Sequence, residues 1–466
     1  MKCNETMKRL VRYIYYNGFV VLALRLIGVR VRRDTMTIWQ MFAEGVWRVG
    51  CRGLIPTRKS WKIARICENA TKIRIFLTVP EWWGGGAVYY LNEQIKAFER
   101  GVISLVVSPA GIGQMLTVRV YDGPDKIVRF LIDNMSALHY LPHGKVEDVV
   151  VSTIVAWHDV IGLDEMNDAG IEKLMHQILS VKHATGCKLL YLLHDYYCFC
   201  PRLFLVPYEG HYCAKETDVA ACVACCKNGV RDCDIIASGT DAAHWREVMV
   251  KFLSEADEIR AFCEDTVRRM KQVFPQFDYT LVPHPEPTAI KRKAHIKFDD
   301  LRVGIIGNIS RYKGVAEVIK LAQYLSKVAP DVRIVVIGKL CADNIPNFTN
   351  VYQTGRYDPV DLPNLVEKYG INVAFFSSTF PETFSYVMHE IVQLGLPVVS
   401  YDRGAQRDCA QAYEYGMVIP ETTPEATWVT IQNLYRKMKN RNGRLDNGFV
   451  SPHKSLYEET KDTFRA

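Results

Sequence analysis

The chain alternates short apolar runs with amphipathic stretches, and this alternation starts twice. The first series begins with KIRIFLTV (72–79), and the second begins with LRVGIIGNIS (301–310). Strands that alternate with helices form parallel sheets whose faces the helices cover. Between the two series lies VPHPEPTAIKRKAHIKFDD (282–300), whose prolines and charges are typical of a linker. The sequence therefore predicts two doubly wound α/β domains joined by this linker.

Both series predict several strands and helices in the same alternating order. In the first, further strands are expected at 102–108, 146–155 and 188–195, and helices at 84–101, 168–183 and 241–253. In the second, further strands are expected at 332–339, 350–357, 372–378 and 397–402, and helices at 314–327 and 360–369.

Residues 1–70 carry the basic character of the chain. They contain fourteen Lys and Arg residues against four acidic ones, a net charge of +10, whereas the whole chain of 466 residues has a net charge of +7. Apolar and basic residues recur there at helical spacing, which favours amphipathic helices on an anionic lipid surface. The alternative is a pair of helices packed on the body of the protein.

Other features of the N-terminal segment exclude several classes of protein. The apolar stretch at 19–29 is interrupted by Arg25 and is too short to cross a bilayer, which needs about 20 apolar residues. No small-residue cleavage site follows it, so a secretory signal is not expected. The basic residues are not joined to an aromatic RNA-reading motif, so we expect no nucleic-acid partner. The prediction is a cytoplasmic protein, with the inner face of the membrane as a candidate surface for residues 1–70.

Four loops with suitable chemistry follow expected strands. Ligands of open parallel sheets bind outside the carboxyl ends of the strands, and two facing sheets form a cleft there. The first loop, EWWGGGAVYY (81–90), has glycines that let the backbone approach a sugar or a phosphate. Its tryptophans are candidates either for stacking on an acceptor ring or for packing in the core. The candidate acceptor residues of this loop are Trp82, Trp83, Gly84, Gly85 and Gly86.

The second and third loops offer a histidine and two basic residues. His194 stands at the end of a strand in LLHDYYCFCP (192–201), where it is a candidate for a functional or a structural role. In GNISRYKGV (307–315), a glycine turn opens a helix, and Arg311 and Lys313 are candidates for neutralising a leaving diphosphate. The alternative for both residues is a solvated loop charge.

The fourth loop, FPETFSYVMHEIVQLGLPVVS (380–400), places two carboxylates along one helix with seven residues between them. At 1.5 Å of helical rise per residue, Glu382 and Glu390 are separated by about 12 Å. This distance is too long for two carboxylates that share one glycosidic bond, which stay within about 9.5 Å. It suits contacts to a sugar at one end of a long ligand and a ribose at the other. The amides of 383–386, at the start of the helix, would then face the phosphates between them.

These motifs together resemble the family 4 retaining glycosyltransferases of the GT-B fold. The resemblance covers about residues 72–440 and includes Glu382 and Glu390 at their spacing, followed by GLPVVSYDRGA (395–405). It also includes the glycine loop, the HDYYCFCP segment and the turn GNISRYKG, in the same order and on the same kinds of element.

The resemblance implies a role for each matching residue. Glu382 would contact the donor sugar, Glu390 the nucleotide ribose, and Lys313 the diphosphate. His194 would lie near the donor sugar. The implied reaction is metal-independent transfer from a nucleotide-diphosphate sugar to a glycan or lipid-linked acceptor, with retention at the anomeric carbon. The further donor-binding candidates are Gly307, Asn308, Arg311, Phe384, Ser385 and Tyr386.

One position departs from the family pattern. The family usually has arginine directly after the glycine of the basic turn, and this chain has Asn308 there. Arg311 is a candidate for supplying the missing charge from a different angle. The alternative function is therefore a catalytically inactive subunit that regulates a partner glycosyltransferase; an epimerase or phosphorylase of the same fold is a further alternative.

A cluster of cysteines lies in the expected insertion at 198–233. Four of them have the spacing C-x12-C-x8-C-x2-C, which fits a structural zinc site; the alternatives are free thiols or disulfides. The candidate ligands are Cys200, Cys213, Cys222 and Cys225.

The expected organisation has four parts. A basic helical extension (1–70) precedes an N-terminal acceptor domain (71–287), and a donor domain (288–440) precedes a C-terminal helix (441–466) that crosses back to the first domain.

Overall fold

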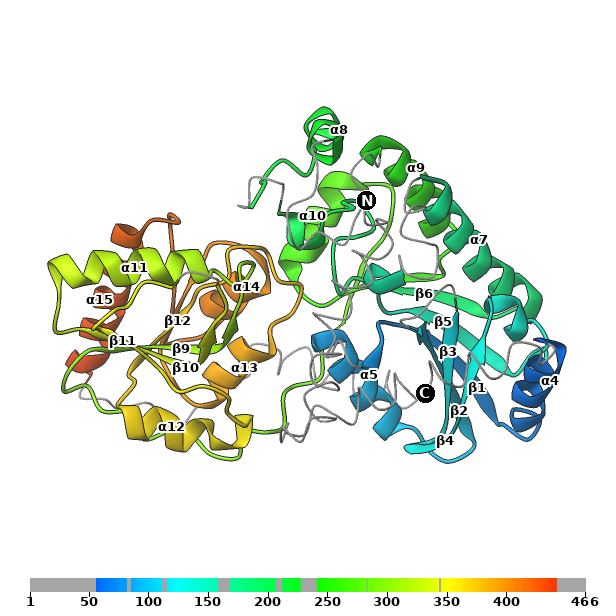
Figure 1. Ribbon diagram of the computed structural model, residues 1–466, viewed down its shortest axis with the longest axis horizontal. Coiled ribbons are helices and arrows are strands. Elements are labelled where there is room, and N and C mark those ends of the chain that lie inside the picture. Colours follow the sequence, from blue (N-terminus) through cyan, green and yellow to red (C-terminus); the bar gives the residue numbers. More distant parts are fainter. Residues whose placement is uncertain are drawn as a thin grey trace, which may run out of the picture.

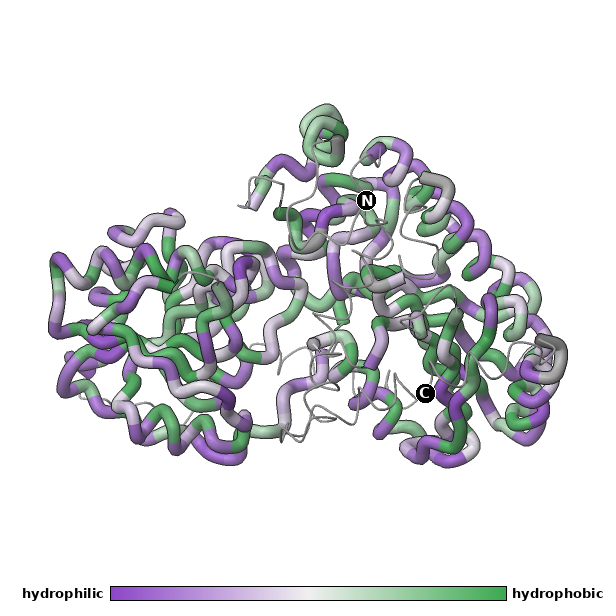
Figure 2. Tube along the Cα trace, in the orientation of Figure 1, coloured by the Kyte–Doolittle hydropathy of each residue, from purple (hydrophilic) through white to green (hydrophobic). Residues whose placement is uncertain are grey.

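The computed structural model describes residues 56–81, 85–110, 115–157, 168–206, 212–227, 241–282, 284–342 and 345–441. Most of the expected N-terminal extension and the expected C-terminal crossover helix lie outside these residues. The described chain forms two lobes side by side, each with a central sheet (Figure 1). Hydrophobic segments run through the interior of both lobes (Figure 2). None of the described helices is long and apolar enough to span a membrane.

The N-terminal sheet, counted over the described residues, has eight strands in the order β4-β3-β2-β1-β5-β6-β7-β8. Strands β3 and β4 form an antiparallel hairpin at one edge, and the other strands are parallel. The hairpin was not expected from the sequence. The strands are β1 (Lys72–Leu77), β2 (Val102–Pro109), β3 (Leu116–Asp122), β4 (Asp125–Ile132), β5 (Val146–Val151), β6 (Lys188–Leu192), β7 (Glu258–Ala261) and β8 (Thr280–Leu281).

Helices cover both faces of this sheet. In β1, Ile75 and Leu77 belong to one core cluster, whereas Phe76 belongs to a second cluster on the other face. Successive side chains of a strand point to opposite faces, so the apolar run of β1 is explained by burial on both sides. Residues of α7 and α9 join the first cluster, and residues of α5 join the second. The helices of this domain are α4 (Pro56–Ile66), α5 (Gly86–Ala97), α7 (Asp168–Thr185), α8 (Val219–Lys227), α9 (Ala242–Leu253) and α10 (Glu264–Val273).

The C-terminal sheet has six strands over the same described residues, all parallel, in the order β11-β10-β9-β12-β13-β14. Helix α11 lies above this sheet in Figure 1 and α12 lies below it. The structure thus confirms the predicted class of two doubly wound α/β domains. The strands are β9 (Arg302–Ile309), β10 (Arg333–Leu340), β11 (Val351–Gln353), β12 (Val373–Phe376), β13 (Val398–Tyr401) and β14 (Gly416–Ile419). The helices are α11 (Val315–Val328), α12 (Leu362–Tyr369), α13 (Tyr386–Gln393), α14 (Gly404–Ala412) and α15 (Pro424–Asn440).

Candidate functional site

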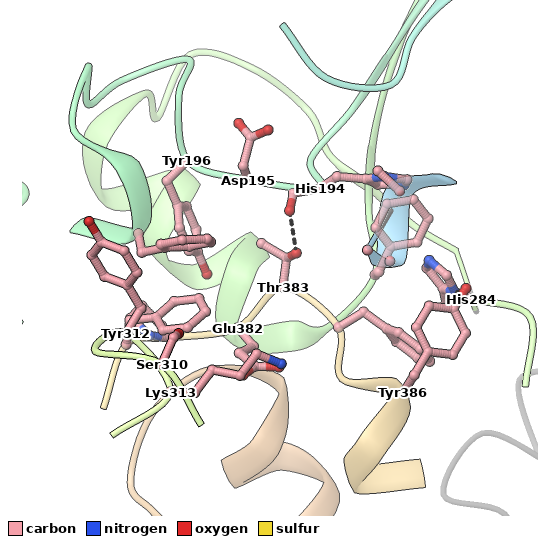
Figure 3. Close-up of a pocket in the computed structure, with 18 residues that line it drawn as sticks. His194, Asp195, Tyr196, His284, Ser310, Tyr312, Lys313, Glu382, Thr383 and Tyr386 are labelled. Atoms are coloured by element: carbon pink, nitrogen blue, oxygen red, sulfur yellow. Dashed lines mark hydrogen bonds between the residues drawn. The ribbon is translucent and has the colours of Figure 1, made fainter. Parts of the chain in front are cut away.

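A cavity of about 270 Å³ lies between the two domains. Its walls come from loops that follow the carboxyl ends of β1, β6, β7, β8, β9 and β12, where parallel sheets bind ligands. Figure 3 shows Glu382 and Lys313 on one wall of this cavity, with His194 on the opposite wall. The N-terminal domain and the linker contribute Gly85, Gly86, Ala87, His194, Asp195, Tyr196, Phe204, Phe262 and His284. The C-terminal domain contributes Ser310, Tyr312, Lys313, Phe380, Pro381, Glu382, Thr383, Phe384 and Tyr386.

Helix α14 holds the backbone of Glu382 in place. The buried side chain of Gln406 accepts a hydrogen bond from the Glu382 amide (3.1 Å) and donates one to the carbonyl of Phe380 (2.7 Å). The amide of Ala405 donates to the carbonyl of Glu382 (2.7 Å). This close approach requires Gly404, whose φ is +67° and whose Cβ, if present, would lie 2.5 Å from the Glu382 amide nitrogen. The loop is therefore clamped by the start of α14.

The carboxylate of Glu382 is held in the cavity with unused hydrogen-bonding capacity. The side chain is 6% exposed, and its Oε1 atom is buried without a hydrogen-bond partner. Burying a carboxylate oxygen in this way costs free energy unless a donor reaches it. A ligand hydroxyl in the cavity would supply such a donor.

The turn before α11 presents Lys313 to the same cavity. Gly314 begins the helix with a φ of +83°, and a Cβ there would lie 1.8 Å from the carbonyl oxygen of Ser377. The hydroxyl of Ser377 donates to the carbonyl of Lys313 (2.7 Å). The turn is thus fixed against the end of β12, which places a cation in the lining of the cavity that also contains Glu382.

Glu390 is not among the residues that line the cavity. It sits on α13, is 7% exposed, and burial raises its pKa to about 7, while the positive charge of Lys313 opposes this rise. The side chain of Ser385 caps the helix by accepting a hydrogen bond from the amide of Met388. The start of α13 points its amide dipoles toward the loop of Glu382, which favours an anion there.

His194 is an uncharged group on the opposite wall. Burial lowers its pKa to about 3, so the imidazole stays neutral at physiological pH. Its Nδ1 atom lies 3.4 Å from the hydroxyl of Ser152, and its Nε2 atom is buried without a partner. Tyr90 packs edge-on against the ring at 4.9 Å between centroids. The free ring nitrogen can exchange a hydrogen bond with a neutral polar group without a change of charge.

Several contacts join the two domains around the cavity. The hydroxyl of Thr383 donates to the backbone carbonyl of His194 (2.8 Å), which Figure 3 draws as a dashed line. The hydroxyl of Tyr386 lies 3.0 Å from Nδ1 of His284. At the edge where α10 meets α14, the amide of Asp265 donates to the carboxylate of Asp408 (2.9 Å).

The structure brings some of the predicted site residues together and leaves others apart. Gly307, Asn308 and Arg311 do not line the cavity, and Asn308 is exposed on β9. Trp82, Trp83 and Gly84 lie outside the described residues. The predicted residues in the lining are Gly85, Gly86, His194, Lys313, Glu382, Phe384 and Tyr386.

The expected zinc site is not supported. Cys200, Cys213, Cys222 and Cys225 all lie in the described part of the chain, yet no group of three His, Cys, Asp or Glu side chains there is arranged to hold a metal ion. Instead, the guanidinium of Arg246 donates to the sulfur of Cys222 (3.2 Å). Cys222 and Cys225 lie on helix α8, and the four cysteines lack the geometry that zinc needs.

Sequence reasoning missed several residues of the site. Gln406 directly follows the recognised GLPVVSYDRGA segment, but only its contacts reveal its role. Tyr312 lies between Arg311 and Lys313 and lines the cavity. The prediction for this turn was based on the charges of its two neighbours, so it did not include the aromatic ring. Further lining residues that the sequence did not indicate include Phe204, Phe262, His284 and Phe380, which look like ordinary core or linker residues in the sequence.

The family comparison identifies one of the two domains. Residues 287–447 match the model of the family described as Glycosyl transferases group 1. The C-terminal domain is therefore similar to the group 1 glycosyl transferases. This domain supplies Lys313 and Glu382 to the cavity. No curated protein matches the sequence.

Three solved structures are similar to most of this chain but have low sequence identity to it. HepE from Anabaena in complex with UDP-glucose is 14% identical, with a TM-score of 0.46 and coverage of 84% of this chain and 95% of that chain. Sucrose-phosphate synthase from Thermosynechococcus elongatus is 12% identical, with a TM-score of 0.47 and coverage of 84% and 98%. The catalytic domain of starch synthase IV from Arabidopsis thaliana, bound to ADP and acarbose, is 10% identical, with a TM-score of 0.48 and coverage of 85% and 99%.

Proposed function

We propose that the protein is a retaining glycosyltransferase of the family 4 type. It would move a sugar from a nucleotide-diphosphate sugar to a hydroxyl of a glycan or lipid-linked glycan. One observation carries this proposal: the domain that matches the group 1 glycosyl transferase model contributes Lys313 and Glu382 to a cavity that the other domain closes with His194.

The residues of the cavity suit the charges of such a reaction. Lys313 and the amide end of α13 would bind the diphosphate, whose negative charge grows as it leaves. The unpartnered oxygen of Glu382 would accept a hydrogen bond from a hydroxyl of the donor sugar, and Glu390 would hold the ribose. His194 would contact the same sugar as a neutral group.

The proposed chemistry is substitution on one face of the sugar. The bond from the anomeric carbon to the diphosphate oxygen breaks, and a bond to the acceptor oxygen forms on the same side. The proton of the acceptor hydroxyl passes to the departing phosphate oxygen. The protein then positions the reactants and stabilises charge, and transfer would proceed equally well in the presence of a metal chelator.

A screen of nucleotide sugars tests the proposal. The full chain is melted with UDP-, ADP-, GDP- and dTDP-sugars, because a ligand at about 100 times its dissociation constant adds about 2.7 kcal/mol to the stability of the folded state. A stabilising donor is then tested for release of its nucleoside diphosphate, with and without EDTA. If no nucleotide sugar stabilises the chain, the proposal is wrong.

A catalytically inactive regulatory subunit is the second candidate. Asn308 stands where the family usually has arginine, and Arg311 does not line the cavity, so Lys313 is the basic side chain that the described residues bring to the lining. Donor binding without any hydrolysis or transfer would favour this candidate over an active enzyme.

The setting that we propose is bacterial surface polysaccharide synthesis at the cytoplasmic face of a membrane. Helix α4, from the basic segment 1–70, supports contact with anionic lipid. Its Ile63 is buried in the N-terminal core, whereas Trp61 is 58% exposed with the guanidinium of Arg65 5.1 Å from its ring centroid. Tryptophan and arginine together suit a lipid headgroup region.

Vesicle sedimentation tests this membrane contact. The full chain should sediment with phosphatidylglycerol vesicles, less so at high salt, and remain in solution with phosphatidylcholine vesicles. Trp61→Ala should weaken the binding, while Tyr140→Ala, which removes another exposed ring of the same domain, should not. Equal binding to both kinds of vesicle would contradict an electrostatic contact.

A further inference from the structure

Phe204 occupies a strained backbone at the rim of the cavity. It has a φ of +61° and is followed by Leu205 at +56°, both within the short 3-10 turn Leu203–Leu205. The left-handed region is unfavourable for bulky side chains, and such residues persist only where the surrounding structure holds them. Here Leu205 is buried in the N-terminal core, and its carbonyl accepts a hydrogen bond from the amide of Cys213 (3.1 Å).

The strained backbone brings the ring of Phe204 against the other domain. Its centroid lies 4.8 Å from that of Tyr312 and 4.5 Å from that of Phe380, and all three residues line the cavity. Tyr312 lies at the end of the cavity away from His284 and Tyr386 (Figure 3). One end of the cavity is therefore an aromatic wall, formed by one ring from the N-terminal domain and two from the C-terminal domain.

We propose that this aromatic wall of Phe204, Tyr312 and Phe380 is a subsite for a pyranose ring of the acceptor glycan. The proposal rests on the proposed glycosyltransferase function. Pyranose rings present faces of polarised C–H bonds, which pack on the electron-rich faces of aromatic side chains. An uncharged wall of this kind selects a ring by shape and does not compete with Lys313 for the phosphates.

The position of the wall favours the acceptor over the donor sugar. Tyr312 and Lys313 are consecutive residues, and both line the cavity. With the diphosphate bound to Lys313 as proposed, the wall would border the side from which the leaving group departs. In the proposed one-face substitution, the acceptor hydroxyl must arrive on that same side. The donor sugar, in contrast, is assigned to the unpartnered groups of Glu382 and His194.

Saturation-transfer NMR tests the subsite without relying on turnover. The full chain is mixed with UDP and, in turn, with the methyl pyranosides of glucose, galactose and N-acetylglucosamine. We expect the wild-type chain to saturate the ring C–H signals of at least one pyranoside. Phe204→Ala should weaken that binding about three- to tenfold, whereas Phe204→Tyr, which keeps the ring, should retain it. Tyr352→Ala, at an exposed ring on the edge strand β11, is the matched control.

The outcomes separate this subsite from the proposed function. If Phe204→Ala retains the pyranoside signals, or if the wild-type chain shows none, the aromatic wall is a packing contact and the inference is wrong. Stronger saturation of an isoprenoid phosphate than of any pyranoside would also overturn it. Binding of UDP-, ADP- or GDP-sugars is measured separately by thermal shift, so loss of the subsite is distinguishable from failure of the donor site. A thermal melt of each variant checks that the fold is intact.

Discussion

The two sides of the cavity offer their ligands different chemistry. The C-terminal side carries charge, with Lys313 and Glu382 in the lining and the buried Glu390 outside it. Apart from Asp195, the described lining residues of the N-terminal side present neutral and aromatic groups, such as the uncharged His194 and the ring of Phe204. The family match covers only the charged side. A charged side suits the phosphates and hydroxyls of a donor, whereas a neutral side distinguishes ligands by shape.

The largest expected effect comes from removing charge on the C-terminal side. We predict that Lys313→Ala and Glu382→Ala each lower sugar transfer by about 100-fold or more, because each removes a group aimed at developing charge or at the donor sugar. Both variants should melt like the wild-type chain. The measurement is nucleoside diphosphate release under saturating donor, with Lys320→Ala on the exposed face of α11 as control. Undiminished transfer by either variant would contradict the assignment of the charged side.

A smaller effect is expected from removing the hydrogen bonds by which Gln406 of α14 clamps the loop of Glu382. Gln406→Ala removes both hydrogen bonds that hold the backbone around Glu382, so we predict a fall in turnover of about tenfold or more. Stability should fall by about 1–3 kcal/mol, because buried backbone groups lose their partners. Gln411→Ala, at an exposed position on the same helix, should change neither quantity. Equal behaviour of the two variants would show that the clamp does not position Glu382.

The pH dependence should also differ between the two sides. Glu390 has a pKa near 7 in the free protein, and a ribose hydroxyl favours its ionised form, so affinity for a nucleoside diphosphate should rise about tenfold from about pH 6 to about pH 8. Glu390→Gln should remove this rise. His194, with a pKa lowered to about 3 by burial, should add no step in that range. Calorimetric titration across this range measures the effect, and a pH dependence that survives in Glu390→Gln would contradict it.

The raised pKa of Glu390 also predicts how the stability of the folded chain depends on pH. The folded chain keeps the proton of Glu390 up to about pH 7, whereas the unfolded chain releases it near 4.5. The unfolded state therefore binds fewer protons between these values, and the contribution of this residue to stability is lost as the pH rises from about 4.5 to about 7. Comparing the unfolding free energies of wild type and Glu390→Gln across that range measures it. A constant difference between the two would contradict the burial of Glu390.

The smallest expected effect concerns the contact between the two sides. Thr383→Val keeps the shape of the side chain but removes its hydrogen bond to the carbonyl of His194, so we predict a loss of about 0.5–1.5 kcal/mol of stability. Thr379→Val, in the same loop, is the control. The hydrogen bond from Arg403 goes to the backbone carbonyl of Thr379, so the substitution leaves it in place. Chemical denaturation measures the difference. If both variants are equally stable, this contact adds nothing to the coupling of the domains.

The sequence predicted the parallel strands well but missed the antiparallel hairpin β3–β4. Parallel strands such as β10 are buried on both faces, so they appear as continuous apolar runs. Strand β4 is exposed or half-buried over its first six residues, and Arg129 interrupts its apolar residues. The Asp122–Gly123 dipeptide was the available signal, because Asp-Gly favours a tight hairpin turn.

The candidate site was predictable where polar residues follow strands. Lys313, Glu382 and His194 stand at such positions, and all three line one cavity. Their assigned roles remain predictions. Arg311 shows the limit of spacing, because it precedes Lys313 by two residues yet does not reach the lining. Phe204 could not be found in this way, because its importance lies in contacts with rings distant in the chain.

The glycine at position 404 has a consequence for how this sequence can diverge. Since no side chain fits between the start of α14 and the amide of Glu382, substitution at Gly404 displaces the loop of Glu382 even though Gly404 does not line the cavity. Descendants of this chain that keep the glutamate are thus expected to keep the glycine as well. If a descendant loses Glu382 or Gly404, we expect substitutions to accumulate at the other position.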